Sequence, residues 1–488
     1  MPERCVATKL TDPQRRLGFP FCRNHRYHFV LRSSELKTAM ASSDGLASVS
    51  ETGQFAEPLR MGEAEHGISV DLVDAAALSV VQGLRDAGFE ALLVGGCVRD
   101  MLLGVAPKDF DVATNATPEE VRGVFRRSRL VGRRFRIAHV RFGRETIEVS
   151  TFRRQVDYED DDVVHSHSRR DLRDRDSARS VDGMILRDNV YGDMHEDAFR
   201  RDFTINALYY DPIDRVLIDY VGGLADLRAH RLKLIGDPNV RFREDPVRIL
   251  RAIRFATKLG FEIDRETDDA IPGAAYMINA VAPARLFDEL CKLLLQGHAT
   301  GAWELLQRFE LADALFPDHN TSTRSLELIR NAMEGTDQRV REDKPVTPGF
   351  LIAVLLWDSY RERLAQHSDA MPLVEARESA SAEVLRDQNE IAAVPKRFSQ
   401  FVREVWLLQP RLEGPPGNGI DKIVTHPRFR AAYDFLLLRA SVGEVEQEIA
   451  EWWTNYQAAD EDERNSMSSA LAPAKGKRRR RRRRRGAA

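Results

Sequence analysis

A glycine-rich turn followed closely by two aspartates is the feature that most limits what this chain can fold into. The segment Leu93–Asp100 reads Leu-Val-Gly-Gly-Cys-Val-Arg-Asp, overlaps the apolar run Ala91–Val94, and continues in a helical pattern up to Gly104. This order predicts a buried strand that turns through two glycines into a helix. Backbone N–H groups at such a turn can approach phosphates, and Arg99 can add a bidentate donor.

The two aspartates lie in the segment Lys108-Asp-Phe-Asp-Val112. Because successive side chains of a strand point to opposite faces, Asp109 and Asp111 are predicted to share one face. Two carboxylates placed together can share divalent metal ions, which activate an attacking hydroxyl and stabilise a leaving pyrophosphate. An acidic pair on a strand is usually a solvated face, but the nearby glycine turn favours phosphoryl or nucleotidyl transfer.

A third carboxylate would complete such a metal site, and the sequence offers two candidates, Asp202 and Glu148. Asp202 could instead cap the segment Phe203–Leu208, and Glu148 could be an outward-facing strand residue paired with an arginine. Spacing alone does not decide between them. The arginines that directly precede Asp202 favour a role for Asp202 beside a triphosphate.

Residues further along the chain form a candidate base-reading helix. The run Glu244-Asp245-Pro246 predicts a helix start with Asp245 at the N-cap and proline at the first helical position. Arg248 and Arg251 follow one turn apart. These arginines form either a polar edge that reads a nucleobase or an edge of the helix that is simply solvated.

Composition excludes several classes of protein. The 488 residues are 43% hydrophobic, enough for about three domains with buried cores. The longest apolar run, Phe350–Trp357, has eight residues, against the ~20 that a membrane span needs. The four cysteines include no CxxC pair, so we expect neither a disulfide framework nor a zinc site. This cysteine usage instead predicts a cytoplasmic location.

The formal charge is unevenly distributed along the chain. Lys475, Lys477 and Arg478–Arg485 carry ten positive charges, so a net charge of −3 leaves −13 on the remainder. Such a basic tail is expected either to bind polyanions or to stay solvated.

Four motifs in order resemble the class II template-independent nucleotidyltransferases, a family of the DNA polymerase β superfamily that contains CCA-adding enzymes and bacterial poly(A) polymerases. They lie within roughly residues 85–265. Three further segments resemble the poly(A) polymerase branch and extend the match over most of the chain after residue 85. The four motifs of the class II family are Leu93–Asp100, Lys108–Val112, Arg200–Asn206 and Arg243–Arg251. The three segments that resemble the poly(A) polymerase branch are Gly132–Val140, His426–Asp434 and the arginine-rich end.

The resemblance implies roles for individual residues. Asp109 and Asp111 would bind Mg²⁺, with Asp202 as the third catalytic carboxylate. Nucleotide binding would fall to a larger set from the glycine turn, the Arg200–Asn206 motif and the base-reading helix: Gly95, Gly96, Arg99, Arg201, Glu244, Asp245, Arg248 and Arg251.

The activity expected from the resemblance is polyadenylation of RNA 3′ ends, with ATP as substrate and pyrophosphate as product. Adenine and cytosine both present an amino donor beside a ring-nitrogen acceptor. Asp245 would accept a hydrogen bond from the amino group, and Arg248 would donate one to the ring nitrogen. A CCA-adding enzyme therefore remains the nearest alternative. A non-catalytic RNA-binding protein would be expected to lack one of the paired aspartates, and a nucleotidyltransferase that modifies proteins or antibiotics would have no evident use for the basic tail.

The expected fold class is α+β, with a small N-terminal mixed β-sheet head followed by a mostly α-helical neck, body and tail. RNA would be held by the helical half, and no membrane would be involved. The expected divisions are a disordered extension at 1–66, the head at 67–225 with a flexible loop at 157–182, the neck at 226–300, the RNA-binding body and tail at 301–458, and a disordered arginine-rich terminus at 459–488.

Overall fold

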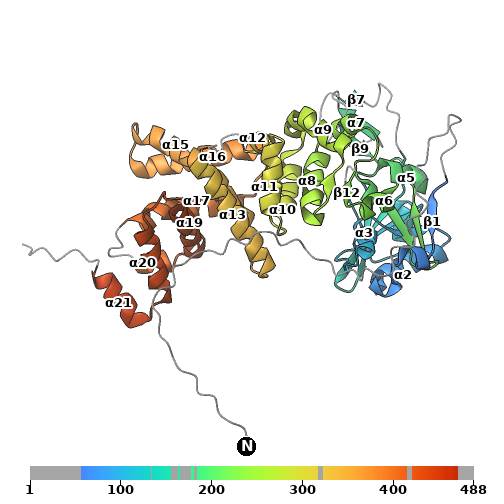
Figure 1. Cartoon of the computed structure of the whole chain (residues 1–488), viewed down its shortest axis with the longest axis horizontal. Coiled ribbons are helices and arrows are strands. Elements are labelled where there is room, and N and C mark those ends of the chain that lie inside the picture. The colour runs from blue at the N-terminus through green and yellow to red at the C-terminus, as the bar shows by residue number, and fades with distance from the viewer. Residues whose placement is uncertain are drawn as a thin grey trace, which may run out of the picture. The chain divides into compact units, whose positions relative to one another are not determined.

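The computed structural model describes residues 57–132, 135–154, 163–164, 177–180, 184–316, 322–414 and 420–470. All of them belong to one compact unit, Glu57–Ala488. The main sheet lies within the blue to green part of the chain, and the yellow to red part is helical (Figure 1). The predicted α+β class, with a mixed-sheet head and a helical remainder, is confirmed.

An eight-stranded mixed sheet forms the head, in the order β1-β11-β10-β2-β3-β6-β5-β4. Its neighbours pair antiparallel except β3 and β6, which are parallel. The strands are β1 (Leu59–Met61), β2 (Ala91–Val94), β3 (Asp111–Thr114), β4 (Ser128–Val131), β5 (Ile137–Phe142), β6 (Glu145–Thr151), β10 (Leu208–Asp211) and β11 (Val216–Asp219).

Alternating side chains of the central strands enter two separate apolar clusters. Leu93 belongs to the larger core together with Val80 of α2, whereas Leu92 and Val94 join a smaller cluster that includes Ala198 of α5. Helices therefore cover both faces, which explains why β2 is buried along its whole length. The helices of the head are α1 (Glu63–His66), α2 (Ala75–Asp86), α3 (Gly96–Leu102), α4 (Pro118–Val124), α5 (Met194–Arg200) and α6 (Gly223–Arg228), with 3₁₀ turns η1 (Val70–Leu72) and η3 (Thr204–Asn206).

Order begins earlier than the predicted boundary after residue 66. Strand β1 pairs antiparallel with β11. His66 is buried and accepts from the Ile68 N–H at 2.9 Å. Assigning 57–66 to a disordered extension is therefore wrong. The edge strand is only three residues long, too short to produce a periodic signal in the sequence.

A second, three-stranded sheet contains part of the predicted flexible loop at 157–182. Its strands are β7 (Val163–Val164), β8 (Ser177–Ser180) and β9 (Ile185–Asp188). Ala178 and Ser180 alternate as buried residues of β8. Small side chains can pack in this way although the polar composition predicts a loop, so the loop prediction is wrong for β7 and β8. The rest of 157–182 lies outside the described residues.

Among the described residues after α6, the regular elements are helices apart from a short parallel pair, β12 (Arg231–Leu232) with β13 (Glu262–Ile263). The predicted disordered terminus from residue 459 begins too early, because 461–470 form a helix. The arginine run lies outside the described residues. The helices are α7 (Pro238–Glu244), α8 (Val247–Leu259), α9 (Arg265–Ala274), η4 (Ala275–Ala280), α10 (Pro283–Leu294), α11 (Ala299–Arg308), α12 (Leu311–Leu315), α13 (Thr323–Arg341), α14 (Pro348–Leu355), α15 (Trp357–Ser368), α16 (Leu373–Ile391), α17 (Lys396–Glu413), α18 (Ile420–Val424), α19 (Phe429–Ser441), α20 (Gln447–Ala458) and α21 (Glu461–Ala470).

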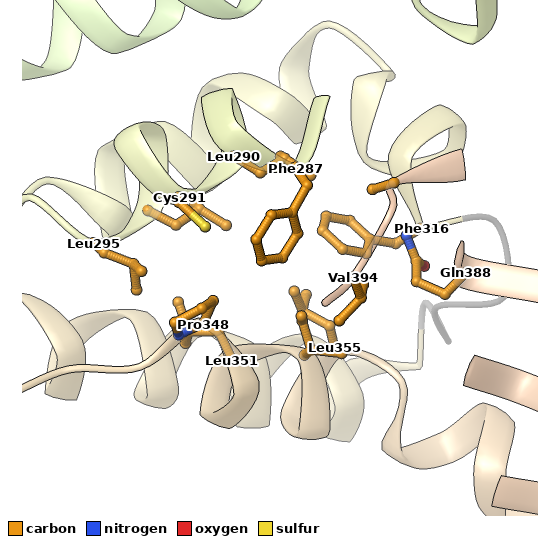
Figure 2. A pocket seen from close by; sticks show the side chains of 13 residues that line it. Phe287, Leu290, Cys291, Leu295, Phe316, Pro348, Leu351, Leu355, Gln388 and Val394 are labelled. Atoms are coloured by element: carbon orange, nitrogen blue, oxygen red, sulfur yellow. The ribbon is translucent and has the colours of Figure 1, made fainter. Parts of the chain in front are cut away.

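Helix α10 lies between α8 and α14. One side of α10 packs on α8. Phe287, Leu290 and Cys291 on its other side line a small apolar cavity of about 30 Å³, opposite Leu351 and Leu355 of α14 (Figure 2). The helix is therefore anchored by apolar packing on the side away from α8.

Candidate active site

The glycine turn has the predicted strand–turn–helix geometry. Strand β2 ends at Val94, Gly95 has φ +80°, and α3 begins at Gly96. A positive φ disfavours other residues at position 95. A Cβ atom there would lie 3.8 Å from Nη1 of Arg201, so the turn also brings the backbone close to the Arg201 guanidinium.

The paired aspartates lie at the start of β3, directly beside the end of β2. Asp111 is the first residue of the strand and aligns with Val94 on β2 and with Glu148 on β6. Asp109 is exposed and lies in the bend before the strand. The predicted strand therefore does not include Asp109, because β3 starts two residues later than the alternating pattern indicated.

Negative charges crowd Asp111. Burial, the charge of Glu148 and the charge of Asp109 raise the pKa of the Asp111 carboxyl to about 6, although Arg201 opposes the shift. A partly buried carboxylate beside two others is destabilised in its charged form unless a cation compensates. The group therefore has the electrostatic character of a cation-binding site.

Glu148 is better placed than Asp202 to supply a third carboxylate. Glu148 lies beside Asp111 in register on the parallel neighbour strand, and its Oε1 is 3.3 Å from Nε2 of His139. Oxygen Oδ1 of Asp202 accepts from the Phe203 N–H at 2.8 Å, while Oδ2 accepts from Nε of Arg251 at 2.7 Å. Nδ2 of Asn206 also donates to Oδ1 at 3.2 Å and Nη2 of Arg251 to Oδ2, so metal binding by Asp202 would have to displace one of these donors.

Burial by itself would raise the pKa of Asp202, but the charge and hydrogen bonds of Arg251 and the Phe203 N–H lower it to about 2. Asp202 is thus held ionised as the partner of a cation. Its role as the third catalytic carboxylate stays a prediction, against which the pairing with Arg251 counts.

The carboxylates fit a hard divalent cation in their chemistry. They offer oxygen donors, which Mg²⁺ prefers, and their mutual repulsion is relieved by a cation. Within the described part of the chain, no group of three or more His, Cys, Asp or Glu side chains is already gathered as a metal site. Asp109, Asp111 and Glu148 would therefore converge further around an ion.

Arg241 holds the segment that carries Arg201 and Asp202. Its Nη2 donates to the carbonyl oxygens of Arg200 and Arg201 at 2.6 and 2.7 Å, and its Nη1 donates to Oε2 of Glu244 at 2.6 Å. Burial and the charge of Arg248 lower the pKa of Arg241 to about 10. Sequence reasoning missed this arginine, since no local pattern indicates that it bonds residues forty positions away.

The predicted triphosphate ligands Arg99 and Arg201 are both engaged by protein groups. Arg99 is buried; Nη1 donates to Asn206 at 2.8 Å and Nε to Asp100 at 2.8 Å. Arg201 donates from Nη2 to Asp197 at 2.8 Å. A guanidinium has five donor hydrogens, so both can be held in place by these bonds and still donate to a phosphate.

Asp245 is not the N-cap of a base-reading helix as predicted. It is the C-cap of α7, and α8 begins at Val247 after Pro246. Pro246 restricts the residue before it to extended backbone, which places Asp245 between the helices. Asp245 and Arg248 consequently do not share one helix face.

The two charged residues of this junction have different partners. Nη1 of Arg248 donates to Oε2 of Glu244 at 2.9 Å, whereas the Asp245 carboxylate accepts from Arg285 of α10. Sequence reasoning also missed Arg285, because it meets Asp245 only in the tertiary structure.

Family models match three successive parts of the chain. Residues 91–233 match the poly A polymerase head domain, residues 260–322 match the probable RNA and SrmB-binding site of polymerase A, and residues 369–486 match the polymerase A arginine-rich C-terminus. The first match contains the glycine turn, the aspartate pair and the Arg200–Asn206 segment.

Solved structures of CCA-adding enzymes share the fold. A Thermotoga maritima CCA-adding enzyme complexed with tRNA has a TM-score of 0.55 at 19% identity, covering 82% of this chain and 85% of its own. A tRNA nucleotidyltransferase complexed with a primer tRNA and an ATP analogue has a TM-score of 0.54 at 22% identity, covering 78% and 98%. These likenesses show that the chain has the fold of these nucleotidyltransferases.

Curated relatives narrow this class. Poly(A) polymerase I of Escherichia coli O157:H7 is 44% identical over 83% of this chain and 87% of its own length, and that of Haemophilus influenzae is 42% identical over 80% and 86%. The CCA-adding enzyme of Lactobacillus helveticus is 35% identical over 49% of this chain and 54% of its own. The chain belongs to the bacterial poly(A) polymerase I family.

Proposed function

We propose that the chain polyadenylates RNA 3′ ends by transferring AMP from ATP and releasing pyrophosphate in a two-metal reaction. The observation that carries the proposal is the crowding of Asp111 by Glu148 and Asp109 at the end of the glycine turn. Family membership supports adenylate transfer as the reaction.

In this proposal Asp109, Asp111 and Glu148 hold Mg²⁺. The ions would supply Lewis-acid stabilisation of the α-phosphate and of the leaving pyrophosphate. Glu148 takes the place of Asp202 as the third carboxylate. Asp202 instead holds the Arg251 guanidinium in position through a hydrogen bond. His139, paired with Glu148, restrains the strand position of that carboxylate.

The nucleotide is held by the groups that converge between the head and α8. The Gly96 N–H, with Arg99 and Arg201, binds the triphosphate, whereas the Gly95 N–H donates to the Leu208 carbonyl oxygen at 3.3 Å. Glu244 orients Arg248, and Asp245 and Arg248 read the base, with Arg251 as a further donor. A carboxylate that accepts and a guanidinium that donates select adenine or cytosine over guanine and uracil.

RNA is the proposed polymeric partner, held by the helical half. The match to a probable RNA-binding site at 260–322 supports this part, as does the basic run at the end of the chain. No helix among the described residues is long and apolar enough to cross a membrane. A cytoplasmic location belongs to the proposal through the cysteine usage.

The proposal is tested by supplying ATP, CTP, GTP and UTP separately to the full-length chain, with Mg²⁺ and a generic RNA, and sizing the products. Long tails from ATP alone are expected. A parallel reaction uses a transfer RNA that lacks its terminal CCA. Efficient CTP addition confined to that transfer RNA would instead assign the chain to the CCA-adding activity. This activity is the second candidate because a CCA-adding enzyme matches 49% of the chain.

A further inference from the structure

A cavity of about 120 Å³ lies between α11 and α13, and none of its lining residues belongs to the candidate active site. Trp303 of α11 and Met333 of α13 line it and are only 2% and 0% exposed. Glu304 and Gln307 of α11 and Arg330 of α13 also line it, and they are exposed. The α11–α13 cavity therefore has an apolar inner wall and a polar rim that is open to solvent.

The two helices that form the cavity are tied together by Asp337 of α13. Its carboxylate accepts from the N–H groups of Ala299 and Thr300 at 2.6 and 3.0 Å, and from the Thr300 hydroxyl at 2.8 Å. Asp337 is buried, and hydrogen bonds to an ionised group are about twice as strong as neutral ones. Because Thr300 itself lines the cavity, this arrangement preforms the cavity before any ligand binds.

The polar groups of the rim are available to a ligand. The side chains of Glu304, Gln307 and Arg330 form no hydrogen bond or ion pair with any residue that the structure describes. A carboxylate only accepts, a guanidinium only donates, and a primary amide does both. The rim therefore suits a ligand that carries a donor, an acceptor and a negative charge.

A nucleotide of single-stranded RNA has all of these groups. Adenine presents an amino donor beside a ring-nitrogen acceptor, its faces are planar and apolar, and the backbone phosphate carries the charge. The volume of the cavity is about four times the ~30 Å³ that one water molecule takes up in the liquid, so a single ion would leave it largely empty. The residues that α11 contributes lie within the segment that matches a probable RNA-binding site.

We propose that the α11–α13 cavity is a subsite for one adenylate of the RNA, upstream of the reacting 3′ end. Glu304 accepts from the adenine amino group, Gln307 pairs with the same edge, and Arg330 binds a phosphate. The inference rests on the proposed function, because that reaction makes RNA whose 3′ end consists of adenylates. A tail that has grown long enough to reach the cavity is then bound more tightly than untailed RNA.

The test measures Kd for labelled oligo(A) and oligo(U) of equal length, using the full-length chain without ATP. Glu304→Gln keeps the side-chain volume and removes the charge of the acceptor. The ratio of the two Kd values, which favours oligo(A) in the wild type, is expected to fall roughly three- to tenfold, the range for a hydrogen bond lost from a partly exposed charged group. Arg330→Gln should instead weaken both RNAs alike and make the slope of log affinity against log salt shallower by about 0.7, because a phosphate contact carries no base information.

Glu327→Gln is the matched control. Glu327 is exposed on α13 and does not line the cavity. The substitution makes the same change in net charge as Glu304→Gln, so any general gain in RNA affinity cancels in the ratio, which should stay within about twofold of wild type.

A second arm separates a tail nucleotide from a free one by measuring the binding of AMP. Binding to the tail predicts that Glu304→Gln changes the Kd of a long oligo(A). A result in which Glu304→Gln weakens AMP binding and leaves the oligo(A) ratio unchanged overturns the assignment to RNA.

A wild-type ratio in folded Glu304→Gln, or an equal fall in Glu327→Gln, overturns the inference. If Glu304→Gln does not fold, Gln307→Ala must show the fall in the ratio, and a wild-type ratio in that variant overturns the inference instead. These results are distinguishable from failure of the proposed function, in which the wild-type chain itself would not extend generic RNA with ATP.

Discussion

Asp111 and Glu148 are register partners on the parallel strands β3 and β6. This pairing brings together two carboxylates that are 37 positions apart in the printed sequence, and their repulsion contributes to the raised pKa of Asp111. The proposed metal site of the head thus depends on the parallel pairing of β3 with β6 in the main sheet.

Glu148→Gln should remove most activity and little stability. The substitution keeps the side-chain volume at a half-exposed position but removes the charge proposed to bind metal. We expect AMP transfer to fall by about a hundredfold or more, with a Tm close to wild type. Activity near the wild-type level in saturating Mg²⁺ would return the third-carboxylate role to another residue.

Asp202→Asn, unlike Glu148→Gln, should lower the stability of the protein. The change leaves Arg251 without its carboxylate partner, at a cost of roughly 1–3 kcal/mol in the free energy of unfolding. Denaturant unfolding of the variant beside Glu148→Gln measures the contrast. Equal stabilities of the two variants would show that the Asp202–Arg251 pair contributes nothing to the fold.

The same pair predicts a pH dependence of stability. Because the pKa of Asp202 is lowered from 3.8 to about 2, the stabilisation is fully present above the unfolded pKa and is lost as the pH falls through the folded one. The difference in unfolding free energy between wild type and Asp202→Asn should therefore shrink between pH 4 and about 2. A difference that grows on acidification contradicts the assignment.

Adjacent glycines before and at the start of α6 should respond differently to alanine. A Cβ at Gly223 would lie 2.1 Å from the Thr204 carbonyl oxygen, close to the Asp202 segment, whereas Gly222 has φ +79° and open space. Gly222→Ala should cost about 1 kcal/mol, and Gly223→Ala considerably more, with impaired AMP transfer. Equal thermal shifts would mean that the Thr204 contact relaxes freely.

Deleting residues 475–485 should weaken RNA binding and leave chemistry intact on saturating primer. The segment carries ten positive charges, and each charge that contacts single-stranded RNA contributes about 0.7 to the slope of log affinity against log salt. The slope should become shallower by up to about 7. The same slope with and without the segment would identify it as a solvated tail.

The local parts of the site were predictable from the sequence, and the long-range pairings were not. The β2–Gly95–α3 turn follows from an apolar run, a glycine and a helical period. The choice between Glu148 and Asp202 depends on which strands are neighbours, which no local pattern reveals. The position of Asp245 between helices reflects Pro246, whose conformational restriction the helix-start pattern did not weigh.

Local sequence patterns also failed to predict two parts of the fold, residues 57–66 and β8. A three-residue edge strand and the four-residue strand Ser-Ala-Arg-Ser lack the periodicity that sequence reasoning requires. Both are defined by their neighbours, β11 for the first and β9 for the second. Arg241 and Arg285 likewise act on residues about forty positions away.

The most direct test of the account is single-turnover AMP transfer from ATP to RNA by Asp111→Asn and Asp109→Asn in Mg²⁺. Both changes remove a charge at the proposed metal site and keep the side-chain volume, and circular dichroism and Tm check that each variant is folded. The account predicts a loss of at least about a thousandfold in each. Extension of RNA at near the wild-type rate by either folded variant would contradict it.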